Sequence, residues 1–158
     1  MTKLIDDLKR YEGFRRFPYR DSVGVLTIGI GRNIQEVGIS EEEAEYLLVN
    51  DIDMCRKQLI GFPWYTYQPP DIRDALVNMC FNMGIRKLLA FNRMLNALAN
   101  KDYATAAKEA LNSMWAREVG VRAQDIAKLF MAYAPGPMPD VVPPTAPSPV
   151  DDNTSDNQ

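Results

Sequence analysis

The chain has 158 residues, of which 46% are hydrophobic and 25% are charged, proportions typical of an ordinary globular protein. It contains no histidine, which excludes Ser-His-Asp and Cys-His nucleophile chemistry, histidine general bases and histidine-ligated zinc. Any catalysis must therefore come from carboxylates, lysine, tyrosine or a hydroxyl group.

Charge and cysteine content limit the partners and the environment of the chain. The formal net charge of −3 comes from acids near the C-terminus, and the remainder is nearly neutral, so we expect no nucleic-acid partner. Cys55 and Cys80 have apolar neighbours in helical patterns, and we interpret them as core thiols rather than as a disulfide. No apolar run is long enough for a membrane span, and Asp6 and Asp7 stand where a Sec-type signal needs an apolar core.

The first third of the chain predicts one helix followed by a small sheet. Leu4 and Leu8 recur at helical spacing, so residues 2–12 should form a helix that Gly13 ends. Residues 13–39 are rich in glycine and β-branched side chains, which favours a hairpin or a three-stranded antiparallel sheet.

The next part of the chain is predicted to be helical. Ser40 and Glu43 have the spacing of a capping box, which predicts a long helix running to about Leu59. Asp102 is placed to cap a later helix. Apolar residues at core spacing predict further helices over residues 70–83, 86–99 (one helix or two short ones), 102–111 and about 121–132.

These elements predict an α+β fold, mainly α, with one domain over residues 1–134. A small antiparallel sheet lobe (about 13–39) should be joined by the long helix to a larger helical lobe (about 60–134 plus helix 2–12), with a cleft between the lobes. From residue 135 to 158 prolines stand among Ser, Thr and Asp, and such a tail buries too little apolar surface to fold. We expect it to be extended or disordered; the alternative is a strap docked in a surface groove.

Two acids stand in contrasting surroundings near the predicted sheet. Glu12 ends the first helix beside Tyr11, where partial burial would favour its protonated form, as a general acid requires. Asp21 lies in a polar turn and should stay ionised, and Thr27 offers a mid-strand hydroxyl that can hold a water. On residue types alone, a solvated acid and an ordinary turn are the simpler interpretation.

A set of motifs in consistent register resembles the phage-type lysozyme family. The motifs are Glu12-Gly13-Phe14-Arg15, Pro18-Tyr19-Arg20-Asp21, the glycine-rich run 24–31, Asn78-Met79-Cys80-Phe81-Asn82-Met83-Gly84, Ser113-Met114-Trp115 and Arg122-Ala123. The resemblance covers roughly residues 2–133 and leaves only the tail outside it.

The resemblance implies catalytic roles for three residues. Glu12 takes the position of the general acid, Asp21 that of the second carboxylate, and Thr27 that of the threonine that helps to hold the attacking water. Arg32 stands where the T-even lysozyme has a histidine, and we expect its planar guanidinium to tie the loop to an acid or to a backbone carbonyl. The segment after Gly31 is shorter than in that relative, which implies a smaller sheet lobe and a more open cleft.

The resemblance also implies three supporting residues. Asn33 and Phe81 match positions that line the sugar-binding cleft, and Arg122 matches an arginine that pairs with the catalytic glutamate. Core packing is an equal alternative for Phe81, whereas for Arg122 the alternative is an exposed helical arginine. Trp115 is more easily explained as a core residue.

The function that the resemblance implies is that of an endolysin. It would hydrolyse the β-1,4 bond between N-acetylmuramic acid and N-acetylglucosamine in peptidoglycan glycan strands, as a monomer with no metal or cofactor. It would wait in the host cytoplasm until a holin gives it access to the wall from the periplasmic side. The alternatives are a virion-associated or chitin-acting lysozyme, a transglycosylase, and a non-catalytic wall-binding module.

Overall fold

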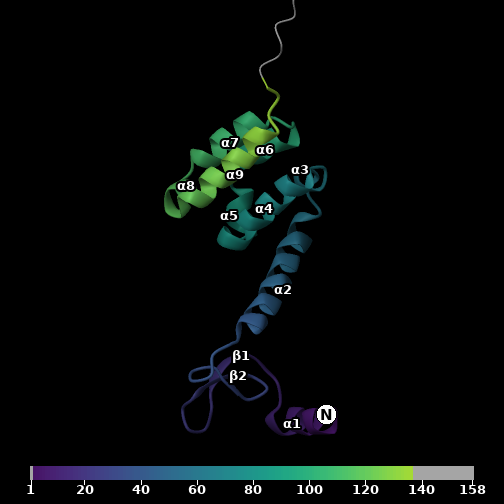
Figure 1. The fold of residues 1–158 in the computed structure, drawn as a ribbon, viewed down its shortest axis with the longest axis vertical. Coiled ribbons are helices and arrows are strands. Elements are labelled where there is room, and N and C mark those ends of the chain that lie inside the picture. The colour runs from purple at the N-terminus through teal and green to yellow at the C-terminus, as the bar shows by residue number, and fades with distance from the viewer. Residues whose placement is uncertain (1, 137–158) are drawn as a thin grey trace, which may run out of the picture. The chain divides into compact units, whose positions relative to one another are not determined.

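The computed structural model describes residues 2–136, which form a small sheet and a series of helices (Figure 1). The elements are α1 (Thr2–Glu12), β1 (Arg15–Arg20), β2 (Leu26–Gly29), β3 (Arg32–Asn33), α2 (Glu41–Leu59), α3 (Pro63–Thr66), α4 (Pro70–Met83), α5 (Ile85–Leu89), α6 (Asn92–Ala99), α7 (Tyr103–Leu111), α8 (Met114–Val119) and α9 (Val121–Ala132). This confirms the α+β, mainly α fold. Nearly all of the predicted tail lies outside the described residues.

Contacts divide the chain into two compact units, Met1–Phe91 and Asn92–Gln158. The predicted assignment of a sheet lobe, a helical lobe and a tail stays a prediction. Among the described residues, no helix combines the length and the apolar character needed to cross a lipid bilayer.

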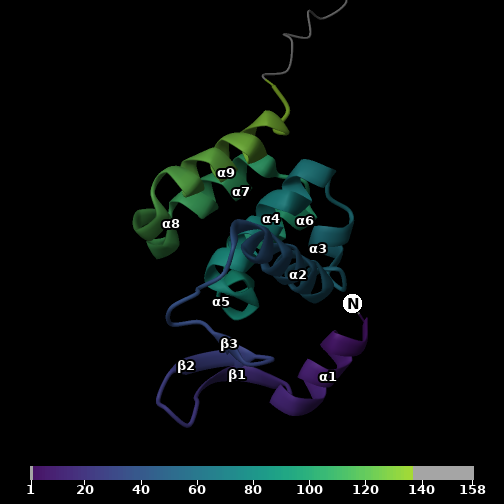
Figure 2. The same ribbon diagram turned by 60° about the horizontal axis from the view of Figure 1, so that its bottom comes forward.

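The sheet of the first unit is antiparallel throughout, with strand order β1-β2-β3, and Figure 2 shows its strands side by side. Thr27 is the central position of the pairing, because it lies opposite Tyr19 of β1 and Asn33 of β3. Only two residues separate β2 from β3, and Gly31 in this turn has φ +71°, in the left-handed region that favours glycine. This confirms the sheet prediction in its three-stranded form.

The long helix α2 begins at the predicted capping box. The Ser40 hydroxyl accepts a hydrogen bond from the backbone N–H of Glu43 at 3.2 Å, and the Glu43 carboxylate accepts one from the N–H of Ser40 at 2.8 Å. Both contacts satisfy backbone donors that the first turn of a helix leaves free. The helix ends after Leu59, as its pattern predicted.

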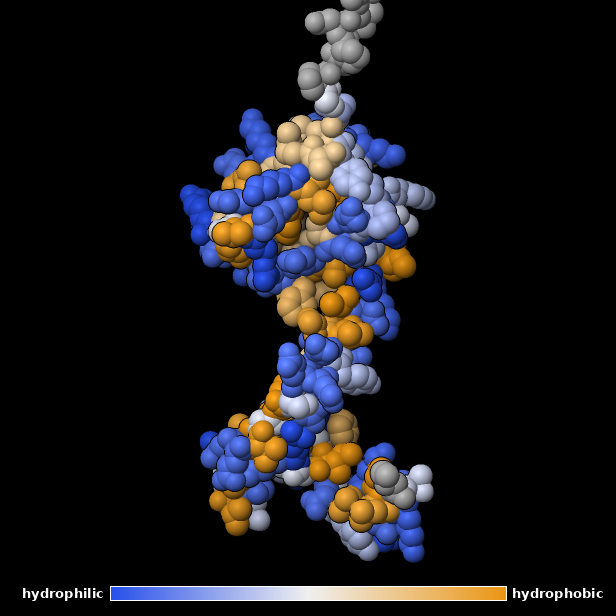
Figure 3. All heavy atoms as spheres, viewed as in Figure 1, coloured by the Kyte–Doolittle hydropathy of each residue, from blue (hydrophilic) through white to orange (hydrophobic). Residues whose placement is uncertain are grey.

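Helix α1 differs from the other long helices because none of its residues is buried. Leu4 and Tyr11 retain 64% and 73% of their exposure, and apolar side chains of α1 are visible on the surface in Figure 3. The expected partial burial of Glu12 is therefore wrong: its side chain is exposed.

Each unit has its own buried side chains. In the first unit Leu59 of α2, Ile72 of α4 and Leu88 of α5 are fully buried. In the second unit Phe130 is fully buried, and Trp115 keeps 6% of its exposure, so it is a core residue as predicted. Cys55 and Cys80 are free and buried, which confirms their interpretation as core thiols. Segment 86–99 contains two short helices, α5 and α6, whereas α3 and α8 were not predicted because each is shorter than two turns.

Candidate active site

Glu12 is the last residue of α1, and its carboxylate lies against the turn between β2 and β3. A Cβ atom placed on Gly31 would stand 3.0 Å from Oε2 of Glu12 and 3.3 Å from its Cδ. The approach is this close because glycine carries no side chain. The chain therefore brings the end of its first helix close to the sheet that carries Thr27 and Asn33.

Asp21 occupies the turn that links β1 to β2. Its Oδ1 accepts hydrogen bonds from the backbone N–H groups of Val23 at 3.0 Å and Val25 at 2.9 Å. Such bonds are typical of aspartate turns, in which the side chain replaces a backbone acceptor. They fix the orientation of the carboxyl group and occupy one oxygen, so that Oδ2 is available to a ligand.

Thr27 is the one candidate residue that is buried, at 4% exposure. Its hydroxyl donates a hydrogen bond to the carbonyl of Val25 at 3.1 Å. A hydroxyl that donates once still has lone pairs that accept a hydrogen bond, so Thr27 can orient a water molecule.

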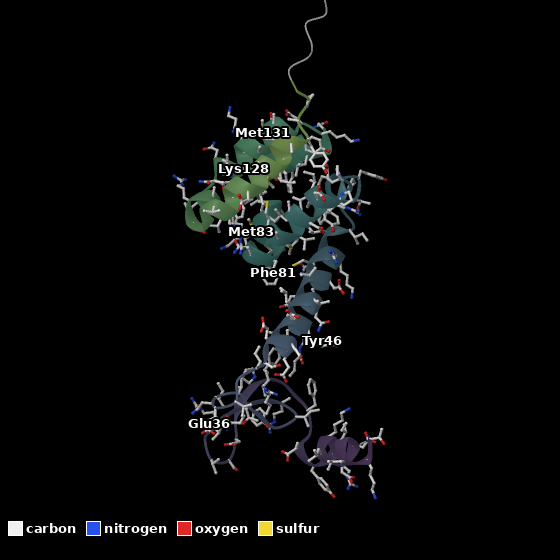
Figure 4. The ribbon with its side chains drawn as sticks, viewed as in Figure 1. Glu36, Tyr46, Phe81, Met83, Lys128 and Met131 are labelled. Atoms are coloured by element: carbon white, nitrogen blue, oxygen red, sulfur yellow. The ribbon has the colours of Figure 1, made fainter. Side chains whose placement is uncertain are left out.

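Asn33 lies opposite Thr27 on β3 and is held by the loop that follows it. Its Oδ1 accepts from the backbone N–H of Glu36 at 3.0 Å, and its amide donates to the Glu36 carboxylate at 3.1 Å. Glu36 is labelled in Figure 4. A sugar contact by the Asn33 side chain must therefore compete with these two local bonds.

Arg32 makes the contacts that its planar guanidinium predicted. Its Nε donates to the carbonyl of Gly38, and its Nη1 donates to Oε1 of Glu43, both at 2.8 Å. This arginine therefore connects β3 to the loop before α2, through the Gly38 carbonyl, and to the first turn of α2, through the Glu43 carboxylate.

Comparisons with known proteins show which family the chain belongs to. The family model described as phage lysozyme matches residues 9–129. The chain belongs to the phage lysozyme family. Relatives include the probable T4-type lysozymes 1 and 2 of Dictyostelium discoideum, which are 29% and 28% identical over alignments that cover 82% of this chain and 95% and 94% of theirs.

A third relative is a larger protein, of which only a part aligns with this chain. The pre-baseplate central spike protein Gp5 of Enterobacteria phage T4 is 29% identical over 81% of this chain, and the alignment covers 27% of the spike protein. The family and the T4-type lysozymes together identify this chain as a glycoside hydrolase of the muramidase type, whose substrate class is peptidoglycan.

Two further candidate residues of the lysozyme lie on helices. Phe81 is on α4 with 47% of its surface exposed, so the core-packing alternative is wrong for it (Figure 4). Arg122 is exposed in the first turn of α9, in the second unit. Its pairing with Glu12 stays a prediction.

The second unit also contains an apolar groove of about 610 Å³ between α7 and α9. It is lined by Ala104, Ala107, Lys108, Leu111, Gln124, Ala127, Lys128 and Met131. None of the candidate residues lines it, so its chemistry is separate from that of the carboxylates. Among residues 2–136, no group of three or more His, Cys, Asp or Glu side chains is placed to hold a metal ion.

Sequence reasoning missed the second role of Glu43. The sequence predicts a capping role for this acid at the start of α2, yet its other oxygen also accepts a hydrogen bond from the Arg32 guanidinium. The sequence did contain a hint of this contact: a carboxylate has two acceptor oxygens and the capping box uses only one, so the other could accept a hydrogen bond from Arg32.

Proposed function

We propose that this lysozyme is an endolysin that cleaves the β-1,4 bond between N-acetylmuramic acid and N-acetylglucosamine in bacterial peptidoglycan. It acts as a monomer, reaching the wall from the host cytoplasm once a holin has opened the membrane. The observation that carries the catalytic proposal is the close approach of the Glu12 carboxylate to Gly31. Gly31 lies two residues before Asn33, and Asn33 pairs with Thr27 in the sheet, so Glu12 and Thr27 belong to the same site.

In this mechanism the exposed carboxyl group of Glu12 donates a proton to the glycosidic oxygen. Asp21, held by two backbone N–H groups, stabilises the oxocarbenium-like transition state with its free oxygen. Thr27 accepts a hydrogen bond from the attacking water. Inversion at the anomeric carbon follows if the two carboxyl groups are far enough apart to admit that water.

The decisive experiment measures the loss of turbidity of permeabilised Gram-negative cells. Glu12→Gln removes the proton donor while keeping the shape of the side chain, so clearing should slow by about 100-fold or more, as expected for general acid catalysis. Glu45→Gln is the matched control, because Glu45 is exposed on α2, away from the candidate residues in sequence, and this variant should clear cells at the wild-type rate. Equal clearing by wild type and Glu12→Gln would sink the catalytic roles and favour a non-catalytic wall-binding module.

Product analysis tests the bond and the stereochemistry. Hydrolysis of purified glycan strands should leave fragments with N-acetylmuramic acid at the reducing end. Nuclear magnetic resonance of the first product formed then tests inversion, which is expected if the two carboxyl groups admit the attacking water between them. Fragments that lack a reducing end would indicate a transglycosylase.

A virion-associated lysozyme is the second candidate, favoured by the similarity to the phage T4 spike protein. The two T4-type lysozymes of Dictyostelium discoideum match over nearly their whole length, which supports an independent enzyme. Purified phage particles separate the two roles: a virion-associated lysozyme should be found in the particles, whereas an endolysin should be found free in the lysate and not in the particles.

A further inference from the structure

Arg32 is held at two points by the segment that connects the sheet to α2. Its Nε donates to the Gly38 carbonyl and its Nη1 to Oε1 of Glu43, each at 2.8 Å. Two donors of one rigid guanidinium, both at short distance, define the position of the group in a way that a single contact does not. The side chain keeps only 35% of its exposure.

Glu43 connects this arginine to the helix. One carboxylate oxygen accepts the Ser40 N–H at 2.8 Å, and the other accepts Arg32. The Ser40 N–H contributes most to holding the pKa of Glu43 below its usual value near 4.5; the charge of Arg32 and the Ser40 hydroxyl act in the same direction, whereas desolvation opposes them. Glu43 is therefore ionised at the neutral pH of a lysis assay.

The two residues next to Arg32 in the chain, Gly31 and Asn33, contact the proposed catalytic residues. Gly31 directly precedes it and lies under the Glu12 carboxylate. Asn33 directly follows it and is the β3 partner of Thr27. A shift of this three-residue segment therefore moves the surface that Glu12 rests on and the strand that pairs with Thr27.

We propose that the Arg32–Glu43 pair is a positioning device for the hydrolytic reaction, because it fixes the Gly31–Asn33 segment to the N-terminus of α2. This inference rests on the proposed roles of Glu12 and Thr27. Neither Arg32 nor Glu43 is assigned a contact with substrate. Because half-exposed ion pairs contribute little to global stability, the loss of this pair should appear in the rate of cleavage more than in the melting temperature.

The test compares Arg32→Met, Glu43→Gln and the double variant with Arg56→Met. Arg56 is the matched control, because it also makes ion pairs in the first unit, with Asp53 at 3.8 Å and with Asp74 at 3.4 Å. Three quantities are measured for each protein: the initial rate of cell clearing, binding to purified insoluble peptidoglycan, and the melting temperature.

The expected result is a rate lowered about tenfold by either single substitution, the size of effect that a modest misplacement of a reacting group produces. Binding should change by less than about twofold. The double variant should be no slower than Arg32→Met, since that substitution already removes the ion pair with Glu43 as well as the hydrogen bond to Gly38. Arg56→Met should keep the wild-type rate.

Two results would overturn the proposal: a wild-type rate for Arg32→Met, or an equal loss of rate in Arg56→Met. Glu12→Gln in the same series separates this inference from the proposed function. If Glu12→Gln is inactive and Arg32→Met is normal, only the positioning role fails. If Glu12→Gln is active, the catalytic roles on which it rests fail as well.

Discussion

Replacing Gly31 with alanine tests the contact between Glu12 and the sheet turn. Gly31 has φ +71°, and an alanine in this left-handed region costs about 1 to 2 kcal/mol. For a domain of this size that cost lowers the melting temperature by roughly 2–8 °C. The added methyl group would also stand 3.0 Å from Oε2, 3.3 Å from Cδ and 3.4 Å from Cγ of Glu12.

These distances are shorter than ordinary contacts, so the flexible end of Glu12 must move by a few tenths of an ångström. The movement costs little stability because the side chain is exposed, but it displaces the proposed proton donor. Since a misplacement of about 1 Å can reduce a rate about 100-fold, we expect a shift of this smaller size to slow cell clearing about tenfold.

Gly29→Ala is the matched control. Gly29 has φ +67°, nearly the same backbone conformation, but nothing lies within 4 Å of the position of its Cβ. Both variants should therefore lose similar stability, measured by thermal unfolding, while only Gly31→Ala should lose the additional rate in the turbidity assay. Equal losses of rate in the two variants would refute the argument that Glu12 rests on Gly31 during catalysis.

Three further predictions follow from local features of the chain. Burial raises the pKa of the Cys80 thiol to about 12, with a further contribution from Cys55, so the Cys80 thiol of the folded protein should resist a chromogenic disulfide reagent at pH 8 and react once guanidinium unfolds the protein. Rapid reaction of Cys80 in the folded protein, followed in a Cys55→Ala variant, would contradict this. The hydrogen bonds from Thr105 hold the pKa of Asp102 below its usual value near 3.8, so this carboxylate stabilises the fold at pH values above the unfolded pKa and the effect is lost as pH falls through the folded pKa. Asp102→Asn should melt earlier than wild type at pH 7, and the difference in melting temperature should shrink as pH falls below 3.8; a difference that does not depend on pH would argue against charge as its cause. Deletion of residues 135–158 should leave the rate of cell clearing nearly unchanged, because the family match ends at residue 129, and a truncated protein unable to lyse cells would show that the tail takes part in function.

The sequence determined the elements whose signals are local. The capping box of Ser40 and Glu43 and the cap of Asp102 appear in the structure as predicted, because each joins a side chain to a backbone group three residues away. Glycine-rich and β-branched composition likewise predicted the sheet between residues 13 and 39. Several different motifs at consistent separations, rather than any single residue, indicated the family.

Only the tertiary structure decided which groups meet. Glu12 reaches Gly31 across a separation of 19 residues, and Arg32 reaches Glu43 across 11, and no local backbone rule sets either contact. Burial was predicted only in part. Cys55, Cys80 and Trp115 are buried as expected, but Glu12 was expected to be partly buried and is exposed, and Phe81, with core packing as an open alternative, is 47% exposed. The physical reason is that a hydrogen bond within one turn depends on the local conformation alone, while contact and burial depend on how whole elements pack.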